Sequence, residues 1–202
     1  MGISTQQFKQ MQARLAGAPR KAQPGPGVPA GPHLTEDTVI LGLDPSLRGT
    51  GYGVIQTTRP SPRTLAHGTI RCPASWPHSR CLVKIAQTLR DLVRAHQPAV
   101  CVVEGLFYAQ NLRTALILGE ARGAALAVVA EAGMEVFEIA PRKVKQAIVG
   151  YGAAQKTAVA RMVQRLLGLP DLPAPDAADA LALALTHARE SSRYWLTPRQ
   201  LI

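Results

Sequence analysis

Four acidic residues border strongly apolar segments of this 202-residue chain. Asp44 closes TVILGLD, Glu104 closes VCVVE, and Asp176 and Asp179 open DAADALALAL. A carboxylate beside a buried element is unfavourable unless a cation meets it, so three such places suggest one shared divalent-metal site. Oxygen ligands favour Mg²⁺ over Zn²⁺, with Mn²⁺ as a possible substitute. Two such ions roughly 4 Å apart would support phosphodiester hydrolysis.

Each acid also has a purely structural explanation. Asp44 could cap a turn, and Glu104 could reach water at the end of a strand. Asp176 and Asp179 would favourably meet the dipole of a helix in its first turn. The prediction of a metal site therefore depends on the coincidence of all three places.

The overall charge indicates the kind of partner. A net charge of +10 and a pI near 10.2 favour a polyanion such as nucleic acid, although a solvated basic surface is the alternative. Cys72, Cys81 and Cys101 are odd in number and form no C-x-x-C pair, which favours reduced thiols. No apolar run is long enough to span a bilayer. We expect a cytoplasmic protein with no membrane partner.

The elements that must position the acids lie in one α/β domain, expected at residues 38–189. Residues 1–37 form a basic, Pro- and Gly-rich arm that we expect to be disordered, and residues 190–202 form a tail. Apolar patterns predict strands at 39–43, 52–56, 65–71, 100–103 and 136–139. Short connections make the first three an antiparallel meander. A helical crossover makes the fourth parallel, so Glu104 would share a sheet edge with Asp44 if their strands are neighbours.

Helical patterns occupy the remaining segments. We expect helices at 75–96, 112–132, from Pro141, at 157–167 and at 176–189. Asp176 and Asp179 are three residues apart, so both project from one face of the last helix. Gly119 and Gly123 are expected to let the 112–132 helix approach the sheet closely.

Five motifs in order are similar to those of a known family. They are ILGLDPSLRGTGYG at 40–53, VEGLFYAQN at 103–111, LGEARG at 118–123, VKQAIVGYG at 144–152 and DAADAL at 176–181. Together, over about residues 38–188, they resemble the RuvC family of Holliday junction resolvases.

This resemblance implies an RNase H-like fold, with a five-stranded mixed sheet flanked by helices. It also implies a homodimeric crossover junction endodeoxyribonuclease that nicks four-way DNA junctions symmetrically with Mg²⁺, leaves 5′-phosphates and serves recombination and repair. A branch-migration motor would be a partner. The family's four catalytic, metal-binding acids fall on Asp44, Glu104, Asp176 and Asp179.

The same resemblance assigns DNA contacts. Phe107 matches an aromatic residue that stacks on a base near the opened crossover, although a core Phe is the alternative. Lys145 and Lys156 match basic residues near the scissile phosphate. Further phosphate contacts, for which a solvated face is an equal explanation, are Arg113, Arg142 and Lys143.

Two positions depart from the family pattern: Ser46 stands where Gly is common, and Gly105 where Gln is common. Neither change removes a predicted metal ligand. Three alternatives stay open. They are another RNase H-like nuclease acting on hybrids or other DNA structures, a non-catalytic junction-binding protein, and an actin-like ATPase, for whose two lobes the chain is too short.

Overall fold

The computed structural model describes residues 37–105 and 111–193, with side chains up to residue 191. Residues 1–36 of the predicted arm, Phe107, and residues 194–202 of the predicted tail lie outside the described residues.

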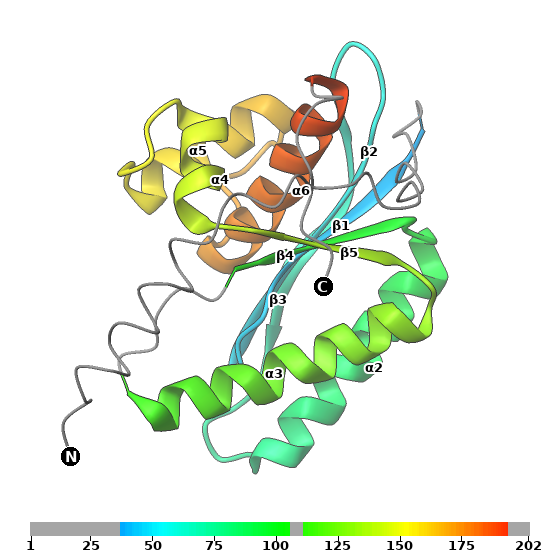
Figure 1. The fold of residues 1–202 in the computed structure, drawn as a ribbon, viewed down its shortest axis with the longest axis vertical. Coiled ribbons are helices and arrows are strands. Elements are labelled where there is room, and N and C mark those ends of the chain that lie inside the picture. The colour runs from blue at the N-terminus through cyan, green and yellow to red at the C-terminus, as the bar shows by residue number, and fades with distance from the viewer. Residues whose placement is uncertain (1–36, 106–110, 194–202) are drawn as a thin grey trace, which may run out of the picture. The chain divides into compact units, whose positions relative to one another are not determined.

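The described strands form one five-stranded mixed sheet in the order β3-β2-β1-β4-β5 (Figure 1). The antiparallel meander is β1 (Val39–Asp44), β2 (Gly49–Gln56) and β3 (Arg63–Arg71). Strand β4 (Val100–Glu104) runs parallel to β1, and β5 (Glu135–Ile139) runs parallel to β4. The predicted fold class is confirmed, and so is the expectation that β1 and β4 are neighbours.

Helices cover both faces of this sheet (Figure 1). On one face lie α2 (His78–His96) and α3 (Leu112–Glu131). On the other lie α4 (Pro141–Val149), α5 (Lys156–Leu167) and α6 (Pro175–Arg193).

The last helix continues beyond its predicted end at residue 189 and ends at Arg193. Glu190, in this added turn, forms an ion pair of 2.9 Å with Lys143 of α4. The apolar pattern that we used to set the boundary stops earlier, because polar residues make up this last turn.

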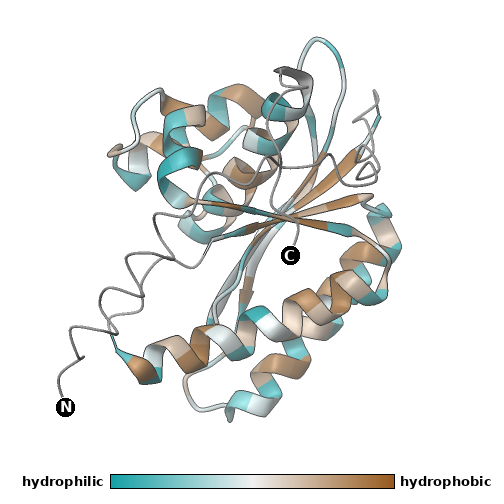
Figure 2. Ribbon diagram, viewed as in Figure 1, coloured by the Kyte–Doolittle hydropathy of each residue, from teal (hydrophilic) through white to brown (hydrophobic). Residues whose placement is uncertain are grey.

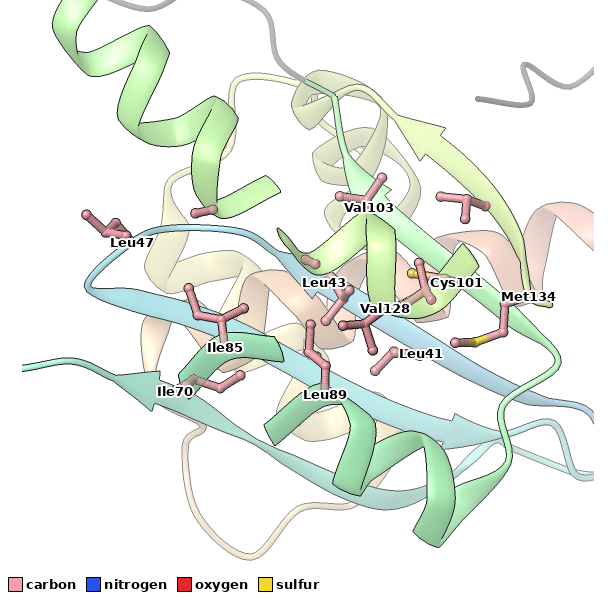
Figure 3. Close-up of a cluster of buried hydrophobic side chains, with 14 of the residues drawn as sticks. Leu41, Leu43, Leu47, Ile70, Ile85, Leu89, Cys101, Val103, Val128 and Met134 are labelled. Atoms are coloured by element: carbon pink, nitrogen blue, oxygen red, sulfur yellow. The ribbon is translucent and has the colours of Figure 1, made fainter. Parts of the chain in front are cut away.

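Successive side chains of a strand point to opposite faces of the sheet, so the hydrophobic core is divided into one cluster on each face. Leu41 and Leu43 of β1 pack with Ile85 and Leu89 of α2, as Figure 3 shows, whereas Ile40 faces the α4–α6 side. Figure 2 shows apolar residues concentrated along the central strands and the sheet-facing parts of the helices. Within the described part of the chain, no helix is both long and apolar enough to cross a lipid bilayer.

Close approach of a helix to the sheet depends on strand glycines. A Cβ on Gly42 would lie 2.0 Å from the carbonyl oxygen of Ala180, and one on Gly51 would lie 2.0 Å from that of Asp176. The backbone of α6 therefore lies directly on β1 and β2. The expectation for Gly119 and Gly123 was wrong: both are exposed, and no described atom lies within 4 Å of a Cβ built on either.

Candidate active site

Asp44 and Glu104 lie side by side at the carboxyl edge of the sheet. They are the last residues of two neighbouring parallel strands, and the residues just before them, Leu43 and Val103, are paired in register. This arrangement explains why two acids 60 residues apart in the sequence meet: parallel strands end at the same edge.

The first turn of α6 brings the other two acids to this edge. Asp44 pairs with Gly51 across β1 and β2, and the backbone of Asp176 crosses Gly51 in close contact. A Cβ on Gly49 would lie 3.2 Å from Oδ2 of Asp176, so this carboxylate lies over the start of β2. Asp179, three residues further along α6, interacts electrostatically with Asp44 and Glu104. The absence of a side chain at Gly49 and at Gly51 of β2 is thus what lets the first turn of α6 come so close.

The negative charges of Asp44, Glu104 and Asp179 are only partly balanced by nearby positive charges. The pKa of Asp44 is raised from 3.8 to about 7, first by burial, then by the charges of Glu104 and Asp179 and by a side-chain hydrogen bond with Glu104. Burial also raises the pKa of Glu104, with a further increase from the charge of Asp179. Partly buried acids of this kind are common at functional sites.

Two lysines supply positive charge at the same place. Lys156, at the start of α5, donates a hydrogen bond of 2.7 Å to Oδ2 of Asp179, and this bond raises the pKa of the lysine. Its charge lowers the pKa values of Asp44 and Glu104, and that of Lys145 on α4 lowers the pKa of Glu104. The predicted basic residues therefore face the predicted acids.

The chemistry of this cluster fits a divalent cation. Asp44, Glu104 and Asp179 offer oxygen donors, and a bound cation would remove the repulsion that raises two of their pKa values. Within residues 37–105 and 111–193, no three acidic, histidine or cysteine side chains lie close enough to hold a metal ion as they stand. Asp179 is instead paired with Lys156. Binding of a metal ion by Asp179 therefore requires Lys156 to release this carboxylate.

The other predicted DNA contacts lie in different settings. Arg113 is exposed in the first turn of α3. The side chain of Arg142 packs against Gly152, where an added Cβ would lie 2.8 Å from its Cγ. Lys143 pairs with Glu190. The structure does not gather these three around the acids as it does Lys145 and Lys156.

A buried hydroxyl closes the turn after Asp44. Thr50 is fully buried; its Oγ1 donates to the carbonyl of Ser46 at 2.6 Å and accepts from the Ser46 amide at 3.2 Å. Because only the backbone of Ser46 makes these bonds, they do not depend on the side chain at position 46. We did not identify Thr50 from the sequence, although a hydroxyl residue four positions after a turn residue is a usable signal.

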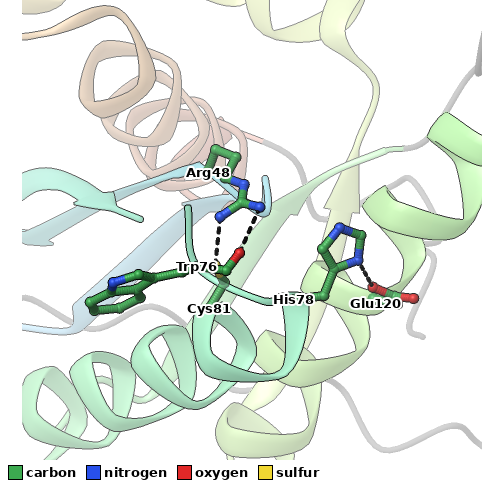
Figure 4. A network of polar contacts seen from close by, with 5 residues as sticks. All are labelled: Arg48, Trp76, His78, Cys81 and Glu120. Carbon is green, nitrogen blue, oxygen red and sulfur yellow. Dashed lines mark hydrogen bonds and ion pairs between the residues drawn. The ribbon is translucent and has the colours of Figure 1, made fainter. Parts of the chain in front are cut away.

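Arg48 anchors the same turn to the beginning of α2 (Figure 4). Its guanidinium donates to the carbonyl oxygens of Pro73 at 2.5 Å and Trp76 at 2.9 Å, and to Sγ of Cys81 at 3.1 Å. These acceptors lie 25 to 33 positions away in the sequence, so no local pattern indicates them. The loop that follows Asp44 is consequently held at both ends.

Comparison with known proteins identifies relatives of the whole domain. Residues 40–187 match the model of the family described as crossover junction endodeoxyribonuclease RuvC. The protein of that name from Halorhodospira halophila is 47% identical to this chain, over 77% of this chain and 92% of that protein. The one from Chromohalobacter salexigens is 45% identical, over 75% of this chain and 81% of that protein. The solved structure of Thermus thermophilus RuvC in complex with a Holliday junction substrate superposes with a TM-score of 0.70. It is 35% identical and covers 75% of this chain and 93% of that chain.

Proposed function

This chain belongs to the RuvC family of crossover junction endodeoxyribonucleases, and we propose that it resolves four-way DNA junctions at the acidic cluster on its sheet edge. The observation that carries the proposal is the meeting of Asp44, Glu104 and Asp179, from three separate elements, next to two lysines. Retention of all four acids argues against a protein that only binds junctions.

The family is metal-dependent, and we propose Mg²⁺ as the metal of this chain, with Mn²⁺ able to replace it. Asp44, Glu104, Asp176 and Asp179 would hold two ions per site. Bound there, the ions would promote ionisation of the attacking water and offset the charge on the departing oxygen. Asp44 and Glu104 each interact with the other and with Asp179.

The basic residues would bind and orient the DNA. Lys156 and Lys145 lie at the cluster, so an incoming phosphate would meet their charges next to the acids. Arg113, Arg142 and Lys143 would bind more distant phosphates, and Phe107 would stack on a base near the crossover. We further propose that a homodimer presents two such sites to the two-fold symmetric junction, in concert with a branch-migration motor.

The experiment that tests this function compares substrates. The protein is incubated with Mg²⁺ and a mobile four-way junction, a linear duplex of the same sequence, or an RNA/DNA hybrid. We expect paired, symmetric nicks in the junction alone. Cutting of the hybrid alone would instead assign the chain to another RNase H-like activity, and binding of the junction without cutting would leave only the non-catalytic alternative.

A further inference from the structure

A nearly buried arginine contacts the strand end that carries Glu104. Arg122 of α3 has 8% of its surface exposed. One guanidinium nitrogen, Nη1, donates to the backbone carbonyl of Glu104 at 2.6 Å, and the other, Nη2, donates to Oε2 of Glu138 at 2.6 Å. A guanidinium that has lost its water needs such partners, and the bidentate fork of arginine suits two acceptors at once.

These bonds fix the backbone where β4 ends. The amide of Gly105, the next residue, donates to the carbonyl of Ile139 on β5 at 2.9 Å. The peptide unit between Glu104 and Gly105 is therefore held from β5 through its amide and from α3 through its carbonyl. This unit determines how the Cα of Glu104 is oriented and hence where its carboxylate lies.

Gly105 provides the space that Glu138 occupies. A Cβ on Gly105 would lie 2.9 Å from Oε1 of Glu138 and 3.3 Å from its Cγ. Any side chain at position 105 would push the Glu138 carboxylate, which is the charge partner of Arg122. Gly105 therefore leaves the space that the Glu138 carboxylate needs in order to pair with Arg122.

We propose that Arg122 and Glu138 are positioning residues that hold the end of β4, and with it Glu104, next to Asp44 at the sheet edge, an inference that rests on the proposed function. The charge of Asp179 repels Glu104, and the charge of Asp44 does so once ionisation of Asp44 breaks their shared hydrogen bond, so an unrestrained strand end would relax away from them. The buried guanidinium opposes that relaxation through the backbone, without touching the metal or the DNA. Its loss weakens metal binding and slows cleavage, while the basic surface still binds the junction.

The primary test measures Mn²⁺ binding to the metal-free protein by titration calorimetry. Glu138→Gln keeps an acceptor but removes the charge, and Arg122→Lys keeps the charge but loses the fork. We expect each to weaken Mn²⁺ binding by about 10- to 100-fold, as is typical when a residue supporting a metal ligand is changed. The rate of junction cleavage should fall at a limiting concentration of Mn²⁺ and recover at a high one. The affinity for the junction without metal should stay within about twofold of wild type.

A matched control removes an ion pair far from the site. Glu131 of α3 pairs with Arg90 of α2 at 3.2 Å, and both side chains are at least half exposed. Glu131→Gln should leave Mn²⁺ affinity and cleavage unchanged. Equal loss in the control and in Glu138→Gln would show a general effect of charge and overturn the inference.

A double-mutant cycle tests the steric part and needs no change at Arg122. Gly105→Ala should weaken Mn²⁺ binding in the wild-type background but have no further effect in the Glu138→Ala background, because the atoms that the new Cβ would strike are gone. Additive effects, or wild-type Mn²⁺ affinity in Glu138→Gln, would overturn the inference even if junctions are cut. Absence of junction cutting by wild type would refute the proposed function instead, and the Mn²⁺ measurements would still decide the inference.

Discussion

The ammonium group of Lys156 lies 2.7 Å from Oδ2 of Asp179, so one of the three converging acids is already paired with a cation from the chain itself. The lysine side chain is 71% exposed, whereas the aspartate side chain is only 20% exposed. Lys156 can therefore swing into solvent or toward a phosphate while Asp179 stays in place. The pair separates two roles that a metal-dependent nuclease needs: a carboxylate for the metal and a cation for the DNA.

Replacing this lysine should change metal binding and cleavage in opposite directions. In Lys156→Met, the competing cation is gone and no like charge repels the metal, so Mn²⁺ affinity should rise several-fold by calorimetry. Junction cleavage should slow, and the slope of log K against log salt for junction binding should decrease by about 1. Weaker Mn²⁺ binding in this variant would contradict the competitive role of Lys156.

The raised pKa of Asp44 makes the metal-free protein less stable at neutral pH. Its folded-state pKa of about 7 exceeds the ordinary value of 3.8, so protonation favours the folded state. This contribution is complete below about pH 4 and is lost as the pH rises through about 7. Asp44→Asn, which cannot ionise, should gain stability over wild type across that window, on the order of a few kcal/mol above pH 7.

Thermal unfolding from pH 4 to 8 in the presence of a chelator measures this difference. Addition of Mg²⁺ or Mn²⁺ should reduce the stability difference between Asp44→Asn and wild type, because the cation stabilises only the ionised wild-type site. A Tm difference between wild type and Asp44→Asn that does not depend on pH would show that burial and the neighbouring carboxylates do not raise the pKa of Asp44.

The strand glycines should tolerate no side chain where α6 crosses them. Gly51→Ala places a Cβ 2.0 Å from a backbone oxygen, which cannot move without shifting the helix. We expect a loss of at least about 2 kcal/mol in the free energy of unfolding. Gly119→Ala on α3 has open space and should stabilise the helix by up to about 1 kcal/mol. Urea denaturation of both variants measures these changes in the free energy of unfolding. Similar changes in the two variants would contradict the close packing of α6 against β2.

The hydroxyl of Thr50 should matter for both stability and activity. Thr50→Val keeps the shape but leaves the amide and carbonyl of Ser46 without a partner, at a cost of about 1 to 3 kcal/mol. Cleavage should slow because the turn beside Asp44 loosens. Thr88→Val is the control, since its hydroxyl bonds the Lys84 carbonyl on an exposed helix face. Chemical denaturation and cleavage rates of both variants test this expectation.

Sequence patterns predicted the strands and the sheet edge because buried strands have continuous apolar runs, and acids at their ends stand out. The same reasoning could not find Arg122 and Glu138, which are 16 positions apart and resemble ordinary surface charges of a helix and a strand. It also misjudged Gly119 and Gly123, since a small residue on a helix is equally compatible with close packing and with exposure. Only the three-dimensional packing separates these cases.

The measurement that tests the central claim most directly is strand-resolved cleavage of a mobile four-way junction in Mg²⁺ by wild type and by Asp44→Asn, together with junction binding by both. We predict paired, symmetric nicks by wild type, no nicks by the variant, and equal binding, because the substitution removes a metal ligand and leaves the basic surface unchanged. Nicking by the folded variant at the wild-type rate, or loss of binding together with loss of cutting, would contradict the account.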